Sequence, residues 1–362
     1  MKKLPISLTS IMLIIGAIIF ISYLYLVGFW NVVEVISALD LRIALITILI
    51  DLACIGLFAL GWKLLLRNPG MKFRHCFEIV LVSIFGDLMI PTGSVSGEIL
   101  RITLTAKRSN IQISEATASV LIHRLLLAIT FGVVFGISLV VIMMTQAISL
   151  ASLYLFIALA TVDLILGVIG IYAAFRVHRF ERFVEWLAVK TGNFIRIFRS
   201  RYNVADMRAR VMGGFKTFGR AMTSVKKTSI FASTAVLTAR WFMIASIPYL
   251  MFFSLGHPIS YWVALSVSIF ASMVQMIPVG IPGLVGVMEI SMTAFFMGFG
   301  IPADIAASGT ILTRLVIFWF ELLLSSVATS LQGIRGLNVL TNKGDDRGGL
   351  SHPVQRQHPQ VI

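Results

Sequence analysis

The stretch MIPTGSVSGEILR, residues 89–101, places a proline, two glycines and a Glu/Arg pair inside an otherwise apolar chain. Its charged residues are Glu98 and Arg101, and Arg124 follows on the next apolar run. Arginine binds phosphate oxygens well, and a nearby carboxylate can orient the arginine or exchange protons. A charge at the centre of a membrane helix costs about 2.5–3.5 kcal/mol on insertion scales, so such residues face each other or a polar cavity. Arg101 and Arg124 are therefore candidate anion-binding residues, and Glu98 is a candidate for orienting them or exchanging protons.

A second stretch, PVGIPGLVGVMEIS at residues 278–291, repeats this pattern. Pro282 precedes Glu289 by seven residues, the spacing of the first proline and glutamate, and Arg314 follows on the next apolar run. The offset of about 190 residues indicates a weak internal repeat. The expected ion pairs are Glu98 with Arg124, and Glu289 with Arg314.

Each pair also has a structural interpretation. A buried ion pair can simply hold two helices together, and breaking it is costly whatever its purpose. Glu98 could instead pair with Arg101, three residues further on, and Glu321 could compete for Arg314. The residues alone leave these alternatives open.

Other ionisable residues lie inside or beside apolar runs. Asp51 and Arg240 are candidate ion or proton sites, with a mutual pair or a backbone donor as the alternative. His123 could relay protons or be an ordinary interior histidine. Asp87 could line a cavity or cap the nearby chain break, and Asp163 has no obvious partner.

The composition identifies lipid as the solvent for most of the chain. Of 362 residues, 58% are hydrophobic and 13% charged, which leaves no room for a separate soluble enzyme. We predict an all-α polytopic membrane protein, because about 20 apolar residues suffice to span a bilayer. The six runs of this length are Leu8–Trp30, Leu41–Leu66, Val120–Thr145, Ala151–Phe175, Ile230–Leu255 and Ile305–Leu331.

Two further apolar segments are too short to span simply. Phe77–Ile90 and Trp262–Ile277 each end at a proline. Such breaks are tolerated at membrane depth only where protein or a water-filled cavity covers the freed backbone. We therefore predict two re-entrant or broken helix pairs, with a half-helix starting near Ser96 whose N-terminus faces an anion. The expected hinge residues are Pro91, Gly93, Gly97, Pro278, Pro282 and Gly283.

The basic residues predict the orientation. Between residues 176 and 227, thirteen Lys/Arg meet three acidic residues, so the positive-inside rule places this loop and both termini in the cytoplasm. The first broken pair then starts from the cytoplasmic side and the second from the outer side, as in an inverted-topology repeat. Apolar positions 180, 183, 184 and 187 predict an amphipathic helix at the membrane surface, rather than a nucleic-acid site.

These boundaries predict a single membrane domain over residues 1–332. It contains a first repeat at about 41–145, a basic cytoplasmic loop at 176–229 and a second repeat at about 230–332. A disordered cytoplasmic tail is expected at 333–362, because that segment is polar and rich in Gly, Pro and Gln.

At PTGSVSGEILR with LIHRLLLAITFG, and at IPGLVGVMEIS with TRLVIFWFELLLSS, the chain resembles the flippase-like transmembrane family. The membrane half of the bacterial lysylphosphatidylglycerol synthase/flippase typifies that family. The resemblance runs from Leu8 to about Leu331 and implies an inverted-repeat lipid translocator. The substrate-binding residues implied are Glu98, Arg101, Arg124, Glu289 and Arg314.

The sequence departs from the family in two places. No soluble aminoacyl-transfer domain follows, so synthesis of an aminoacylated lipid is not implied. Met292 stands three residues after Glu289, where the first stretch has Arg101, so the two halves are not expected to bind alike.

The leading functional hypothesis is translocation of a phospholipid or polyprenyl-linked lipid across the cytoplasmic membrane. An anionic phospholipid or polyprenyl phosphate headgroup would enter a cavity between the repeats, and a homo-oligomer or a lipid-synthesis enzyme could be the protein partner. The alternatives are an integral-membrane transferase acting on a lipid headgroup and a non-catalytic partner subunit. No Walker-type phosphate loop or Cys/His metal spacing is present, so we expect no cofactor, metal or catalytic residue.

Overall fold

The computed structural model describes residues 39–66, 70–145, 176–198 and 203–332, with isolated residues between 18 and 37 and between 154 and 172. All regular elements in these ranges are helices, which confirms the all-α membrane fold. Within the described residues, four helices are long and apolar enough to span a membrane: α3 (Leu41–Lys63), α6 (Ile113–Thr145), α10 (Lys227–Ser254) and the helix Ala303–Gln332. That last helix contains α13 (Ala303–Arg314) and the π-helical segment η3 (Leu315–Phe320).

Three regions of the sequence prediction fall wholly or largely outside the described residues. They are the spans expected at Leu8–Trp30 and Ala151–Phe175, the latter including Asp163, and the tail at 333–362.

The first broken pair consists of α4 (Phe73–Met89) and α5 (Val95–Ser109). The turn between them holds Gly93 and Ser94 at φ angles of 64° and 67°. Glycine reaches this left-handed region without steric cost, whereas a residue with a side chain seldom occupies it. The pair therefore breaks where the proline and glycines predict, and α5 begins one residue before the expected Ser96.

Gly97 allows α5 to pack closely against α4. A Cβ atom at this position would overlap the Asp87 carboxyl group and the Ser83 carbonyl oxygen. The Gly97 N–H donates a hydrogen bond to Asp87 Oδ1 at 2.7 Å, and Ser96 Oγ donates to the Gly86 carbonyl oxygen at 3.0 Å. Asp87 thus caps the first turn of α5.

The second broken pair consists of α11 (Tyr261–Gln275) and α12 (Val287–Gly298). A longer connection joins them and includes a short 3-10 helix, η2 (Pro282–Leu284). Gly283 within it has a φ of 61°, and the Phe318 ring lies so close that a Cβ at Gly283 would overlap it. Positive φ angles also occur at Gly280 and Gly286.

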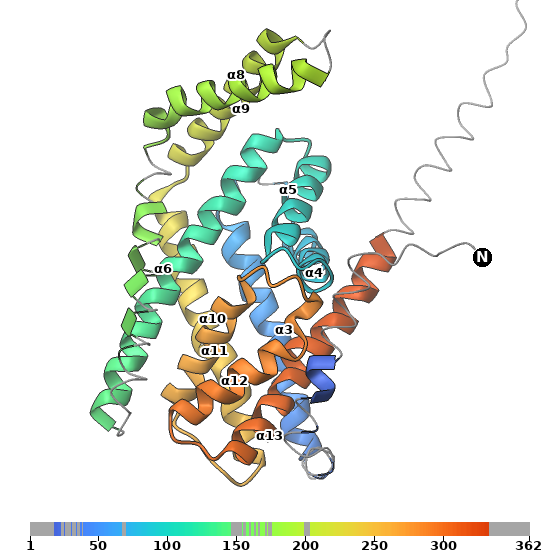
Figure 1. Ribbon diagram of the computed structural model, residues 1–362, viewed down its shortest axis with the longest axis vertical. Coiled ribbons are helices and arrows are strands. Elements are labelled where there is room, and N and C mark those ends of the chain that lie inside the picture. Colours follow the sequence, from blue (N-terminus) through green and yellow to red (C-terminus); the bar gives the residue numbers. More distant parts are fainter. Residues whose placement is uncertain are drawn as a thin grey trace, which may run out of the picture.

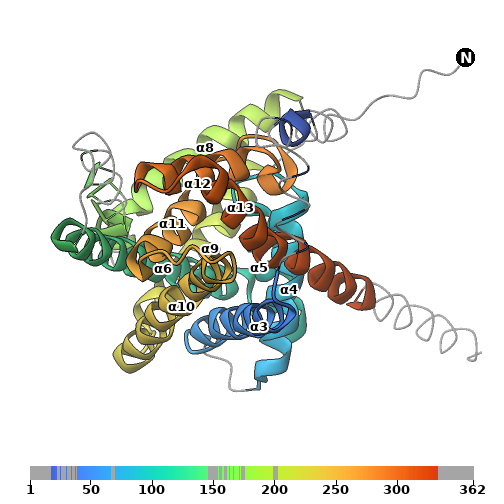
Figure 2. The same cartoon turned by 90° about the horizontal axis from the view of Figure 1, so that it is seen from below.

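The two halves of the bundle have the same order of helices and opposite directions. We call α3, α4, α5 and α6 the first half, and α10, α11, α12, α13 and η3 the second half. In Figure 1 the chain direction of α3 is opposite to that of α10, and the direction of α6 is opposite to that of α13. Each broken pair packs on the first span of its own half, α4 on α3 and α11 on α10 (Figure 2). This is the architecture of an inverted repeat.

The two chain breaks touch each other inside the bundle. Gly93 lies against the carbonyl group of Met276 and against Pro278, so that a Cβ at Gly93 would overlap that carbonyl oxygen and lie 3.4 Å from Pro278 Cδ. In addition, α4 contacts η2. Gly93 of the first break and Pro278 of the second therefore meet at one junction.

The basic segment folds into a helical hairpin of α8 (Glu181–Phe198) and α9 (Val204–Thr223), which extends beyond the bundle at the top of Figure 1. α9 packs against α6. Phe183, Trp186 and Leu187 on α8 are all exposed. The amphipathic helix is thus present, and its position at a membrane surface stays a prediction.

Replacing Gly97 by alanine tests the close approach of α4 and α5. Overpacking at such a contact costs about 1–3 kcal/mol, so we expect Gly97→Ala to lower the thermal unfolding midpoint in detergent. Gly136→Ala is the matched control, because nothing lies within 4 Å of the Cβ position of Gly136 on α6. An unchanged midpoint for Gly97→Ala would contradict this packing.

Candidate functional site

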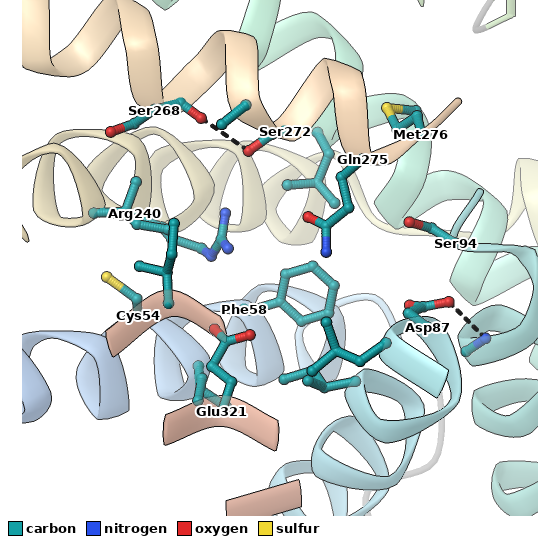
Figure 3. Close-up of a pocket in the computed structure, with 18 of the residues that line it drawn as sticks. Cys54, Phe58, Asp87, Ser94, Arg240, Ser268, Ser272, Gln275, Met276 and Glu321 are labelled. Carbon is teal, nitrogen blue, oxygen red and sulfur yellow. Dashed lines mark hydrogen bonds between the residues drawn. The ribbon is translucent and has the colours of Figure 1, made fainter. Parts of the chain in front are cut away.

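A cavity of about 240 Å³ lies between the two halves of the bundle. Both halves contribute every one of their helical elements to its lining. Figure 3 shows Gln275 of α11 pointing into the cavity and Arg240 and Glu321 facing each other beside it. The charged side chains of the lining are four arginines and three carboxyl groups: Arg101, Arg124, Arg240, Arg314, Asp87, Glu98 and Glu321.

The ion pair of the first half is open to this cavity. Arg124 Nη1 on α6 donates a hydrogen bond to Glu98 Oε1 on α5. The two side chains keep exposed fractions of 27% and 24%, and both line the cavity. Glu98 lies in the first turn of α5, where the helix dipole favours a carboxylate. An anion that enters the cavity could therefore replace Glu98 as the partner of Arg124.

The ion pair of the second half is enclosed. Arg314 Nε donates to Glu289 Oε1 at 2.8 Å, and Arg314 Nη2 donates to the Gly283 carbonyl oxygen at 3.0 Å. The side chains of the pair are only 6% and 2% exposed, and the guanidinium lies 4.1 Å from the centre of the Phe318 ring. Although Arg314 borders the cavity, its hydrogen bonds are used to hold the chain break in place. For this pair the geometry favours the structural interpretation.

Both half-helix N-termini are capped by carboxylates of the chain itself. Asp87 accepts the Gly97 N–H at the start of α5, and Glu289 Oε2 accepts the Gly286 N–H at 2.6 Å at the start of α12. At the start of α5, Ser96 N–H also donates to Thr92 Oγ1 at 2.8 Å. These internal acceptors take the place in which we expected an external anion. The arginines of the lining are therefore the groups that could bind an anion in this cavity.

Arg101 is buried and does not form the ion pair with Glu98 that their spacing along the chain would allow. Its exposed fraction is 3%, and its Nη1 lies 3.3 Å from His123 Nδ1. The guanidinium lies 5.2 Å from the centre of the Phe58 ring and 5.3 Å from that of Trp62. Glu98 pairs with Arg124, and no ion pair forms between the described side chains of Glu98 and Arg101. Arg101 thus adds a positive charge to the lining of the cavity.

Of the four arginines that line the cavity, Arg240 makes the fewest hydrogen bonds to described residues. Its guanidinium lies 5.4 Å from the ring centres of both Phe58 and Trp241. Its Nε is buried without a hydrogen-bond partner, and no described residue forms an ion pair with it within 4 Å. Asp51 and Glu321 are its nearby carboxyl groups. Arg240 is therefore available to an anion in the cavity.

Sequence reasoning missed two residues of this site. Glu321 was considered only as a competing partner of Arg314, yet it lies opposite Asp51 and Arg240. Its position two helical turns after Arg314 was the available signal. Gln275 could have been found as the polar residue at the end of the half-helix before Pro278. Within the described part of the chain, no group of three or more His, Cys, Asp or Glu side chains is placed to hold a metal ion.

Replacing the arginine of each ion pair by glutamine tests whether the Glu289–Arg314 pair contributes more to stability than the open Glu98–Arg124 pair. Arg314→Gln leaves Glu289 buried and unpaired, which costs about 3–5 kcal/mol. Arg124→Gln leaves Glu98 beside a polar cavity, and we expect about 1 kcal/mol or less. Thermal unfolding in detergent should show a much larger decrease for Arg314→Gln, and equal decreases would argue against this distinction.

Comparison with known proteins places the chain in a family. The family model of the lysylphosphatidylglycerol synthase transmembrane region matches residues 8–325. A UPF0104 membrane protein of Pyrococcus horikoshii is 26% identical over 324 residues, which cover 88% of this chain and 95% of that protein. A UPF0104 membrane protein of Methanothermobacter thermautotrophicus is 23% identical over 313 residues, or 86% and 91% of the two chains. No solved structure matches significantly. The chain belongs to the family of the lysylphosphatidylglycerol synthase transmembrane region.

Proposed function

We propose that this membrane protein is a lipid translocase of the flippase type. It would move the headgroup of an anionic phospholipid or a polyprenyl-linked lipid through the cavity between its two inverted halves. The observation that carries this proposal is the location of the open Glu98–Arg124 pair and of Arg240 in a cavity lined by both halves. A site shared by two inverted repeats can be exposed to either side of a membrane when one half moves against the other.

The chemistry of the cavity suits a phosphate headgroup. Phosphate accepts hydrogen bonds on several oxygens, and charge-assisted bonds from arginine are among the strongest in proteins. Arg124 would exchange Glu98 for the phosphate, while Arg240 supplies a second guanidinium. Ser94 and Gln275 line the same space and offer neutral donors. At about 30 Å³ of liquid per water molecule, the cavity has room for roughly eight waters, and so for a small headgroup.

The contact between the two breaks supports a moving site. Gly93 faces the carbonyl group of Met276 and the ring of Pro278, and no ion pair joins the described residues of the two turns. Such a contact can separate more readily than the enclosed Glu289–Arg314 pair beside it. We propose that this junction closes the cavity on one side and opens when a headgroup passes.

We also propose the orientation of the protein in the cytoplasmic membrane. The α8–α9 hairpin and the ends of the chain would lie in the cytoplasm, because the Lys and Arg residues gather there. The exposed apolar side chains of α8 would then rest on the inner leaflet, whose anionic lipids attract basic residues.

Lipid exchange in proteoliposomes tests the proposed function. The purified protein is reconstituted with a trace of headgroup-labelled phosphatidylglycerol, and the label that becomes accessible to an external quencher is followed. We expect exposure faster than in protein-free vesicles. Removing a charge-assisted hydrogen bond costs about 1.5–3 kcal/mol, so Arg124→Gln should slow exchange by about tenfold or more.

Arg74→Gln is the matched control for this experiment. Arg74 is also an arginine in an ion pair, with Glu78, but its side chain is 77% exposed and it does not line the cavity. Its loss should leave the exchange rate unchanged. Equal slowing by both substitutions, or no exchange above protein-free vesicles with several anionic headgroups, would refute the proposal.

A further inference from the structure

The Asp51 carboxyl group on α3 is fully buried, and no described residue donates a hydrogen bond to it. Its exposed fraction is 0%, and neither of its oxygens accepts a hydrogen bond from a described residue. The group within hydrogen-bonding reach is the Glu321 carboxyl, one residue after η3. A carboxylate can only accept hydrogen bonds, so these two groups can bond to each other only when one of them carries a proton.

The carboxyl pair has access to the cavity on one side only. Glu321 lines the cavity and points toward Arg240 (Figure 3), whereas Asp51 lies behind it and is not part of the lining. A proton from water in the cavity can therefore reach Glu321 first and be shared with Asp51. Because Arg240 interacts with both carboxyl groups, the protonation of the pair affects the arginine that we assign to the headgroup.

Few other charges surround this cluster. Cys54 lies near it on the same helix as Asp51, and Arg314 of α13 interacts with Glu321. His123 of α6 lies beyond Arg240 and contacts the edge of the Phe58 ring. Arg314 is already bound to Glu289, so Arg240 is the cation that responds most directly to the state of the pair.

We propose that Asp51 and Glu321 share one exchangeable proton, and that this proton crosses the membrane together with the anionic headgroup. The inference deepens the proposed lipid translocation and rests on it. With both carboxylates ionised, Asp51, Glu321 and Arg240 carry one net negative charge, which retains the arginine and repels a phosphate. One proton makes the cluster neutral and allows Arg240 to bind the phosphate.

This coupled transport of one proton and one lipid is balanced in charge and atoms. One proton leaves water on the first side and binds a carboxylate oxygen of the pair, while one monoanionic headgroup enters the cavity. On the other side the proton returns to water and the headgroup returns to the leaflet. Since each ligand favours binding of the other, the coupling is reciprocal. The pair thus carries a proton in the same direction as the lipid, without net charge movement.

A proton fits this place better than a metal cation. Hard cations such as Ca²⁺ take about six or more oxygen ligands. Only two carboxyl groups meet here, and no larger His, Cys, Asp or Glu group occurs among the described residues. The guanidinium of Arg240 beside them would also repel a metal ion.

Infrared spectroscopy of the intact protein tests the shared proton without any transport. A protonated carboxyl group has a C=O stretching band that a carboxylate lacks and that shifts in D₂O. We expect such a band at neutral pH in the wild type and its loss in both Asp51→Asn and Glu321→Gln. Glu78→Gln is the control, because Glu78 is paired with Arg74 and Arg108 away from the cavity and should leave the band unchanged. A wild-type band that persists in both folded cluster variants would overturn the shared proton.

A pH gradient across proteoliposomes tests the coupling. Vesicles with a lumen one pH unit more alkaline than the medium receive labelled phosphatidylglycerol, with the membrane potential clamped to zero. One proton per lipid predicts accumulation of the label in the inner leaflet, up to about tenfold. Because transport of a proton with a monoanion is electroneutral, releasing the clamp on the membrane potential should not change the ratio of label between the inner and outer leaflets. With the Asp51→Asn variant, the label should be equally distributed between the two leaflets under the same gradient.

The two arms separate this inference from the function on which it rests. Wild-type protein that exchanges lipid but ignores the pH gradient would overturn the coupling and leave lipid translocation intact. Wild-type protein that exchanges no lipid would overturn both translocation and coupling. If Asp51→Asn does not fold, Glu321→Gln takes its place in the gradient experiment, and accumulation equal to that of the wild type would then contradict the coupling.

Discussion

A helix that stops inside a membrane leaves backbone N–H and C=O groups for which lipid offers no partner. In both broken pairs of this protein a carboxylate from the chain accepts a hydrogen bond from one backbone N–H group at the start of the next helix: Asp87 at α5 and Glu289 at α12. In the second pair Arg314 neutralises that carboxylate and also binds the free carbonyl of Gly283. Without these internal charges the chain could not bring two helix breaks, and the polar cavity beside them, into the centre of the bundle.

The two halves satisfy this constraint in different ways, and the difference assigns them different roles. At the repeat offset, Asp87 of the first half corresponds to Pro278 of the second, which has no side-chain acceptor. Glu289 must therefore cap α12, and its pair with Arg314 is enclosed. In the first half Asp87 caps α5, so that Glu98 and Arg124 are left to face the cavity. The first half thus leaves its ion pair open to the cavity, while the second half encloses its own.

Much of this arrangement could be predicted from sequence, because the cost of a charge or a proline in lipid leaves few solutions. The four described spans, both breaks and the partners Glu98–Arg124 and Glu289–Arg314 follow from apolar length, proline position and the need to pair charges. Spacing along the chain could not show which pair is enclosed, because that depends on whether another residue caps the helix. The expectation of an external anion at the α5 N-terminus stays a prediction, and Asp87 already accepts one N–H group there. Likewise, the meeting of Asp51 with Glu321 joins residues 270 positions apart and depends on how α3 packs against η3.

The proposed lipid translocation requires that a lipid headgroup occupies the cavity between the halves. Photo-crosslinking with a phospholipid that carries the reactive group on its headgroup tests it most directly, with the labelled peptides identified by mass spectrometry. We expect label on cavity-lining residues such as Ser94, Ser272 and Gln275, and less of it in Arg124→Gln. Label confined to outward-facing positions such as Phe231 and Val327, at the same level in Arg124→Gln, would contradict it.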